Sequence, residues 1–401
     1  MKVYNCRMCK GKLSEPKLQF PPTPLANEFV KTTEPQELFP LEVCVCEDCG
    51  HYQLNEHIEP ERLFRNYVFV AGTSPVNVEH FKCYAEDMVA KFSLKDSSKI
   101  LDIASNDGTL LKHFKNMKFR VLGIDPAKNI AEEANKNGIE TLPEFFTNKF
   151  ADTILEKYGK FDLITANNVF AHVPDLEDFA LGVKKLLVPQ GVFTFEVSYF
   201  ESVCDNLLFD TIYHEHSSYH TINPLAKFFK RLGMQLFDFQ IINTHGGSIR
   251  VFVRLYSKKH KVSLVDMHGY FEPKMNEKIK RLQKDIKLLG YELREKLQEI
   301  KSQNKSIAIY GTPAKATTLM YALKLDPTMI DFAVDDAPLK QGTYTPGMHI
   351  PVLHPDELYK RKPDYVLVLA WNFADSIIEK HKAVSEYGGK FIVPIPELKV
   401  V

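Results

Sequence analysis

The sequence has little of what would attach the chain to a large charged partner. Lys+Arg and Asp+Glu each number 51 among 401 residues, so no net charge favours nucleic acid or an anionic membrane surface. No uninterrupted apolar run approaches the roughly 20 residues that span a bilayer, and the N-terminus lacks the apolar run of a signal peptide. We therefore expect a cytoplasmic protein without nucleic-acid or membrane partners, acting as a monomer or small homo-oligomer.

Internal repeats and low-complexity segments are also absent, and the length is enough for two or three domains. Residues 1–65 hold five of the seven cysteines, and 66–258 alternate strands with helices. A highly charged helical linker, at 259–304, precedes a second alternation at 305–401. Such alternation predicts α/β domains with a doubly wound parallel sheet.

The expected elements follow from hydrophobic periodicity. A helix is predicted at 75–95, and a solvated helix or helix pair at 273–303. Short apolar runs predict strands at 99–104, 120–125, 161–166 and 191–197, and again at 306–311, 330–336, 364–370 and 390–396.

Two Cys-x-x-Cys pairs predict a metal site near the N-terminus. They are Cys6 with Cys9 and Cys46 with Cys49. Because two intervening residues let one tight turn offer both sulfurs, two such turns make a closed tetrahedral zinc site. Four thiolates leave no open coordination position, so we expect the zinc to be structural. The alternatives are ordinary buried cysteines or a redox dithiol, and Cys44 should face away on a strand.

A turn of small residues follows the first strand of the alternation and would let a cofactor approach the backbone. A second strand, about twenty residues on, ends in a carboxylate that could bind both hydroxyls of a ribose. The Gly-x-Gly-x-x-Gly sequence of dinucleotide folds is missing. The acidic loop therefore favours the sulfonium of S-adenosylmethionine (SAM), although helix capping alone could explain single aspartates. The predicted SAM-binding residues are Asp102, Ala104, Ser105, Asn106, Asp107, Gly108, Asp125 and Pro126.

A third strand leads into residues 166–175, which resemble the region of class I methyltransferases that lies against the cofactor. This resemblance adds Asn167, Asn168 and His172 to the predicted cofactor site.

Residues 213–220 gather four titratable or hydroxyl-bearing types in the order Tyr-His-Glu-His-Ser-Ser-Tyr-His. Methyl transfer to carbon needs a carbon nucleophile, ordinarily the enolate formed by removing a proton next to a ketone. That step needs a base that titrates near neutrality and a donor for the developing oxyanion. Histidine and tyrosine could meet these needs, but the spacing alone equally permits a zinc site or a surface histidine cluster.

Together these motifs resemble the zinc-containing nucleotide-sugar C-methyltransferases that make branched deoxysugars. The resemblance covers nearly the whole chain. It includes the four cysteines, residues 105–108, 167–176, 213–216 and 245–250, and the C-terminal stretch that begins at Gly311.

The resemblance implies a zinc-binding domain (1–65), a SAM-binding class I methyltransferase Rossmann domain (66–258), the linker, and a Rossmann-like domain (305–401) that helps to bind a nucleotide-linked sugar. It implies His216 as the catalytic base, supported by Tyr213 and Glu215. The residues expected to contact the substrate are Tyr67, Ser74, His214, His245, Lys315 and Lys340. Phe69 departs from the family pattern, which usually has tyrosine there.

We therefore predict an enzyme that methylates a carbon of a nucleotide-linked 4-keto deoxysugar through an enolate. Three alternatives stay open from the sequence. They are O- or N-methylation of a glycan or small metabolite, a non-catalytic nucleotide-binding module, and an NAD oxidoreductase.

Overall fold

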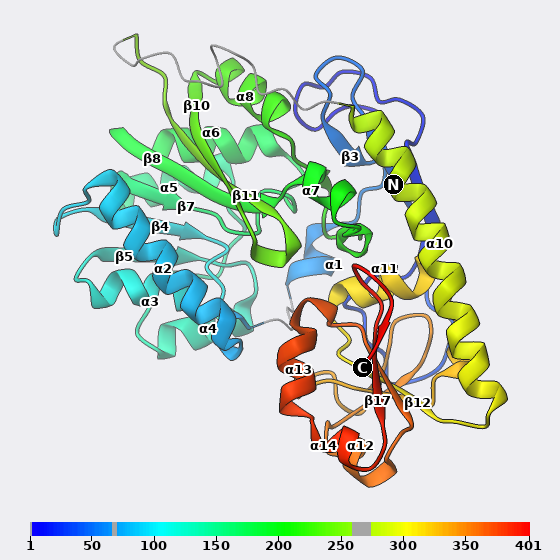
Figure 1. The fold of residues 1–401 in the computed structure, drawn as a ribbon. Coiled ribbons are helices and arrows are strands. Elements are labelled where there is room, and N and C mark those ends of the chain that lie inside the picture. Colours follow the sequence, from blue (N-terminus) through cyan, green and yellow to red (C-terminus); the bar gives the residue numbers. More distant parts are fainter. Residues whose placement is uncertain (1, 66–69, 259–273) are drawn as a thin grey trace.

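The computed structural model describes residues 2–65, 70–258 and 274–401, except for the side chain of His245. In these residues the strands form three sheets, which Figure 1 shows together with one long helix beside them. Tyr67 and Phe69 lie outside the described residues.

The N-terminal sheet is four-stranded and antiparallel, in the order β1-β2-β3-β9. Its first three strands come from the cysteine-rich segment, whereas β9 comes from residues directly after the Tyr-His-Glu-His motif. Tyr52 pairs with Tyr219, and Gln53 with Ser218. The strands are β1 (Leu18–Thr23), β2 (Phe39–Val45), β3 (Tyr52–Leu54) and β9 (Ser218–Tyr219), and α1 (Pro60–Phe64) follows β3.

The central sheet is seven-stranded, in the order β10-β11-β8-β7-β4-β5-β6. Its strands are β4 (Lys99–Ile103), β5 (Arg120–Ile124), β6 (Thr141–Leu142), β7 (Phe161–Thr165), β8 (Leu187–Ser198), β10 (Met234–Ile242) and β11 (Ser248–Leu255). Strands β4 to β8 are parallel as predicted. At one edge of the sheet, β10 and β11 form an antiparallel hairpin.

Helices cover both faces of this sheet (Figure 1). One face carries α2 (Pro75–Phe92), α3 (Thr109–Asn116) and α4 (Lys128–Lys136), and the other carries α5 (Asn148–Tyr158), α6 (Leu176–Leu186) and α8 (Ile222–Arg231). Helix α2 begins where the sequence predicts, because Ser74 caps it and Pro75 fits the first turn. Short helices complete this region: η1 (Ala71–Thr73), α7 (Phe200–Asp205), η2 (Phe209–Thr211) and η3 (Thr244–Gly246).

The C-terminal sheet has the order β14-β15-β13-β12-β16-β17-β18. The central strands β15, β13, β12, β16 and β17 run parallel, and both edge strands are antiparallel. The strand order reverses between β12 and β16, and ligands of such folds bind at that point. The strands are β12 (Ile307–Tyr310), β13 (Phe332–Val334), β14 (Thr343–Tyr344), β15 (Pro351–Leu353), β16 (Tyr365–Val368), β17 (Lys390–Val393) and β18 (Lys399–Val400). The helices are α11 (Ala314–Ala322), η4 (Pro327–Met329), α12 (Glu357–Arg361), η5 (Trp371–Phe373), α13 (Ala374–Lys380) and α14 (Ala383–Glu386).

The charged segment after the central domain is one helix, α10 (Met275–Ser302), rather than a helix pair. It runs along the N-terminal and C-terminal parts of the molecule (Figure 1). It is solvated on one face only, because nine residues at helical spacing are buried, among them Leu282, Leu289 and Leu293. No helix in the described parts of the chain, α10 included, is long and apolar enough to cross a membrane.

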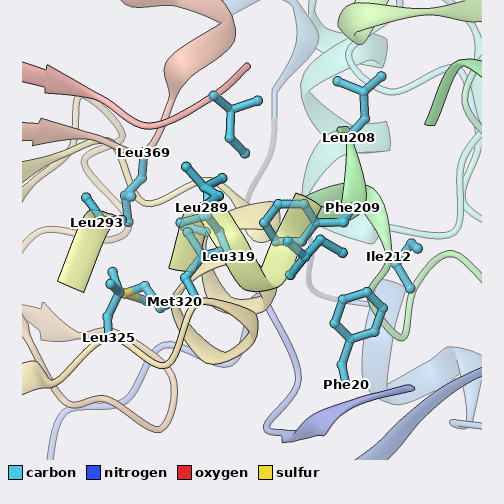
Figure 2. Close-up of a cluster of buried hydrophobic side chains, with 14 of the residues drawn as sticks. Phe20, Leu208, Phe209, Ile212, Leu289, Leu293, Leu319, Met320, Leu325 and Leu369 are labelled. Carbon is cyan, nitrogen blue, oxygen red and sulfur yellow. The ribbon is translucent and has the colours of Figure 1, made fainter. Parts of the chain in front are cut away.

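One hydrophobic core joins all three parts of the chain. Figure 2 shows side chains from β1, from α10, from α11 and from the segment around η2 packed together. The labelled members are Phe20, Leu208, Phe209, Ile212, Leu289, Leu293, Leu319, Met320, Leu325 and Leu369. The η2 segment is therefore fixed between the N-terminal strands and the C-terminal domain.

Candidate active site and metal centre

The four predicted cysteine ligands come together in space. Their sulfurs all lie within 4.8 Å of one another. The Sγ atoms of Cys6 and Cys49 are 3.6 Å apart, and those of Cys9 and Cys46 are 3.4 Å apart. A tetrahedral zinc ion with Zn–S bonds of about 2.3 Å needs sulfurs about 3.8 Å apart. The donor set and its spacing therefore fit zinc, and Cys44 is not part of the cluster, as predicted.

The two cysteine turns share one backbone geometry. The amide of Lys10 donates to the carbonyl of Cys6 at 2.9 Å, and that of Gly50 to the carbonyl of Cys46 at 3.0 Å. Lys10 and Gly50 both have positive φ values, of 64° and 81°, which close the turns. The cluster packs against the central domain, where Arg231 donates to the carbonyl of Met8 at 2.6 Å.

The predicted cofactor loop follows β4 and is tightly turned. Ala104, Asn106 and Gly108 have φ values of 54°, 50° and 77°. A Cβ atom at Gly108 would lie 2.9 Å from Ile139, so only glycine fits there. The hydroxyl oxygen of Ser105 is buried and has no hydrogen-bond partner among the described residues. A buried polar atom of this kind is expected where a ligand completes the hydrogen bonding.

Two buried carboxylates lie at the ends of the neighbouring strands β4 and β5, and one of them is bonded to this loop. Asp125 accepts hydrogen bonds from the amides of Asn106 and Ala127, both at 2.9 Å. Burial raises the pKa of Asp125 to about 6. Asp102 accepts a hydrogen bond from Thr165 Oγ1 at 2.6 Å, and burial raises its pKa to about 7. Asp102 therefore links β4 to β7, two residues before the loop begins.

Residues 71 and 72 lie in η1, just before α2, and their backbone contacts the same loop. The amide of Ala71 donates to Asn106 Oδ1 at 2.8 Å, and the amide of Gly72 donates to Asp107 Oδ2 at 3.0 Å. Pro126, also predicted, accepts a hydrogen bond from Arg65 through its carbonyl at 3.1 Å. The loop is therefore covered by residues that precede α2.

The third predicted part of the cofactor site lies after β7. Asn167 Oδ1 accepts from the amide of Glu196 at 3.1 Å, and its Nδ2 is buried without a partner in the described chain. Asn168 has a φ of 57°. His172 is half-buried, and the loss of hydration around its ring keeps its pKa well below the usual value, so the ring is neutral. The His172 ring lies 4.7 Å from that of His216, between ring centroids. This contact joins the predicted cofactor and catalytic residues.

The predicted base has well-defined partners. His216 Nδ1 lies 2.6 Å from the carbonyl oxygen of Thr211, and Nε2 lies 3.2 Å from the hydroxyl of Tyr213. A carbonyl can only accept, so Nδ1 carries the proton and Nε2 presents its lone pair. Tyr213 also packs against the imidazole, with 4.2 Å between ring centroids.

The other two residues of the motif turn towards the N-terminal domain. Glu215 is buried and accepts a hydrogen bond from Asn27 Nδ2 at 2.6 Å. His214 Nε2 lies 3.0 Å from the carbonyl of Pro40. Both residues, with His172, line a small cavity beside α1. Asn27 lies in a loop without periodicity, and sequence reasoning missed it.

The two predicted lysines of the C-terminal domain are already held by other groups. Lys315 Nζ lies 3.7 Å from Asp210 Oδ2 and 4.1 Å from the centre of the Trp371 ring. Lys340 donates to the carbonyl of Thr312 at 2.9 Å and to Asp335 at 3.2 Å. Both flank the loop after β12, where the strand order reverses.

Two further predicted substrate residues have other surroundings. Ser74 caps α2, accepting from the amide of Asn77 at 3.4 Å. His245 lies in η3, in the turn between β10 and β11, and its side chain is not among those that the structure describes. Neither is brought to the His216 ring by a contact that the structure describes.

Known proteins match this arrangement along the whole chain. Three family models match in order: "Putative zinc binding domain" at residues 6–64, "Methyltransferase domain" at 78–238 and "C-methyltransferase C-terminal domain" at 243–396. The C-methyltransferase NovU of Streptomyces niveus is 34% identical over 407 residues, which cover 100% of this chain and 97% of that protein. The chain belongs to this C-methyltransferase family.

Other relatives and solved structures match smaller shares of the chain. A ubiquinone biosynthesis O-methyltransferase of Bartonella quintana is 31% identical over 98 residues, covering 24% of this chain and 40% of that protein. A solved SAM-dependent methyltransferase of Clostridium acetobutylicum has a TM-score of 0.37 and 16% identity, covering 45% of this chain and 92% of its own. Another, from Anabaena variabilis, has a TM-score of 0.35 and 16% identity, covering 43% and 83%.

Membership of the C-methyltransferase family makes the chain a SAM-dependent methyltransferase, with a structural zinc site in its N-terminal domain. The interpretations as a non-catalytic module and as an NAD oxidoreductase are thereby set aside. Ser105 and Asn167, with their unpartnered buried polar atoms, and the Asp125 carboxylate are residues that fit SAM.

Proposed function

We propose that the enzyme methylates a carbon next to the ketone of a nucleotide-linked 4-keto deoxysugar, with His216 as the general base. The observation that carries this proposal is the hydrogen bond from His216 Nδ1 to the Thr211 carbonyl, 2.6 Å long. It fixes the neutral tautomer in which Nε2 can accept a proton. The choice of carbon as the acceptor rests on the membership of a C-methyltransferase family, since a base of this kind could also take the proton of a hydroxyl.

The proposed reaction begins with proton removal. His216 Nε2 takes the proton from the carbon next to the ketone, and the C–H electron pair becomes the double bond of the enolate. Negative charge moves to the ketone oxygen, which the Tyr213 hydroxyl stabilises by turning from Nε2 to donate to it. SAM, held by residues such as Ser105, Asn167 and Asp125, would supply the electrophilic methyl group that the enolate carbon takes, and the electron pair of the broken S–C bond would stay on the sulfur. The His172 ring next to His216 is neutral, so it places no positive charge beside the imidazolium that forms on His216.

The nucleotide would bind to the C-terminal domain, at the point where its strand order reverses. Lys315 and Lys340 flank that point and supply positive charge for phosphate. In this proposal the chain comprises a zinc-binding domain (1–65), a SAM-binding domain (66–258), a helical linker (259–304) and a nucleotide-sugar domain (305–401).

Hydrogen exchange separates the proposed chemistry from O- or N-methylation. The enzyme is incubated in D₂O with S-adenosylhomocysteine and each of a panel of 4-keto-6-deoxy sugar nucleotides, and NMR follows deuterium at the carbons next to the ketone. We expect enzyme-dependent exchange at one carbon. With SAM instead, product mass and NMR should place the new methyl at that same carbon. A methyl on oxygen or nitrogen would contradict the proposal.

His216→Asn tests the base directly. We expect it to abolish exchange and turnover while calorimetry still detects SAM binding. His354→Asn is the matched control, because the His354 side chain is 58% exposed and lies in the C-terminal domain, away from the motif. Turnover retained by His216→Asn would remove His216 as the base.

A further inference from the structure

A buried carboxylate near the motif is not used by the proposed reaction. Asp210 is completely buried in η2. Its Oδ2 accepts a hydrogen bond from the indole of Trp371 at 2.6 Å, and Lys315 Nζ lies 3.7 Å away. Its Oδ1 has no hydrogen-bond partner in the described chain. A carboxylate of the central domain is therefore held by two side chains of the C-terminal domain, and neither is near it in sequence.

The residues after Asp210 hold the base. The carbonyl of Thr211 receives the hydrogen bond of His216 Nδ1. The carbonyl of Ile212 receives one from Thr318 Oγ1 of α11, at 2.7 Å. The segment Asp210–Ile212 thus contacts the C-terminal domain on one side and the imidazole on the other.

The flanking side chains make this segment a rigid support. Phe209 and Ile212 are buried in the core that α10 and α11 share with β1 (Figure 2). Because close-packed interiors transmit displacement rather than absorb it, a shift of η2 would move the Thr211 carbonyl. A misplacement of about 1 Å at a reacting group can cost roughly a hundredfold in rate.

We propose that Asp210 is a positioning residue for His216: its contacts with Lys315 and Trp371 lock η2, and η2 sets the tautomer and orientation of the imidazole. The inference rests on the proposed role of His216 as the base. Lys315 is also proposed to bind the phosphate of the nucleotide. Binding of the nucleotide would therefore change the position of His216 through the Lys315 side chain and η2. Docking of the C-terminal domain thereby completes the catalytic site.

The main variant is Asp210→Asn, which removes the charge but keeps an oxygen that can accept from Trp371. Asp205→Asn is the matched control. It removes the same charge five residues earlier in the chain. Asp205 pairs with Lys278 and Arg281 on α10 and not with Lys315 or Trp371. We expect Asp210→Asn to lower kcat by roughly tenfold to a hundredfold, with the Kd for SAM unchanged. Asp205→Asn should keep wild-type kcat.

The decisive readout needs no substrate. The 14 histidines are labelled with ¹⁵N, and His216 is assigned by the signals lost in His216→Asn. In the wild type the ring should be protonated at Nδ1, and Asp210→Asn should add the Nε2-protonated form or shift the titration of the ring. Asp205→Asn should leave the signals unchanged. A folded Asp210→Asn protein with wild-type His216 signals and kcat would overturn the proposal.

A second variant covers the case in which Asp210→Asn does not fold. Trp371→Phe removes the indole donor but keeps an aromatic ring next to Lys315, and it should shift the His216 signals in the same direction by less. Unchanged signals and kcat would again overturn the role of Asp210. The proposed function fails separately, if wild-type enzyme with unperturbed Nδ1-protonated His216 methylates no keto sugar in the panel.

Discussion

The zinc site gives a sharp prediction, because the chain contains its own control cysteine. Cys49 is one of the four clustered thiols, whereas Cys44 is buried nearby in β2 and lies outside the cluster. Each is replaced by alanine. Cys49→Ala should lose stoichiometric zinc, since three thiolates leave the site open, and Cys44→Ala should keep one zinc per chain.

The two variants should differ in stability as well. Loss of a metal belongs to the few changes that cost more than about 4 kcal/mol, whereas a typical single substitution costs about 1 kcal/mol. Cys6 and Cys46 are buried in the same core as α6 and α8, so an unfilled site leaves thiols without their counter-ion against the central domain. We therefore expect Cys49→Ala to lose about 4 kcal/mol or more, and Cys44→Ala about 1 kcal/mol.

The measurements are zinc content by mass spectrometry and urea unfolding followed by circular dichroism. A further consequence concerns activity: β3 of the zinc-binding domain pairs with β9, directly after the motif, so Cys49→Ala should also reduce kcat. The reasoning is refuted if Cys49→Ala retains one zinc, or if its free energy of unfolding equals that of Cys44→Ala.

Three other predictions address the cofactor site, the oxyanion and the central core. Tyr213→Phe should lower kcat about 10²- to 10³-fold, as expected for one lost oxyanion donor, without changing the Kd for SAM; an unchanged kcat would contradict its role. Because burial raises the pKa of Asp125 to about 6, SAM should bind best above pH 7 and more weakly as the carboxylate protonates below pH 6. Calorimetry at several pH values measures the Kd for SAM, and Asp125→Asn should remove its dependence on pH. If the variant keeps the pH-dependence of the wild type, the group that titrates is Asp102 and not Asp125. Glu196→Gln should lower the free energy of unfolding in urea by about 3–5 kcal/mol, because it leaves the charge of buried Arg250, 2.7 Å from Glu196, without its buried partner. A loss under about 1 kcal/mol would contradict a stabilising role of this ion pair.

The sequence predicts best what local spacing decides. Two residues between cysteines dictate a turn, and both turns form with a residue of positive φ after them. The small-residue loop after β4 also lies where predicted. In each case a few consecutive residues determine the backbone, so no distant contact is needed to infer it.

Contacts between distant segments were beyond sequence reasoning. The partners of Asp210 are 105 and 161 residues away along the chain, and Asn27 is 188 residues from Glu215. No periodicity connects such residues. The Thr211 carbonyl leaves no signal at all, because any residue type provides one. The direction of the two edge strands of the central sheet comes from the structure alone, since apolar runs predict strands but not their direction.

The need for three parts in one methyltransferase follows from how the segment 209–219 is held. Its first residues, η2, are fixed by Lys315, Trp371 and Thr318 of the C-terminal domain. Its last residues, β9, are paired with β3 of the zinc-binding domain. The motif with His216 lies between these two anchors, whereas the residues predicted to bind SAM follow β4 and β5 of the central sheet. Loosening either anchor should therefore impair proton removal while SAM still binds, because only the acceptor side of the site depends on all three parts.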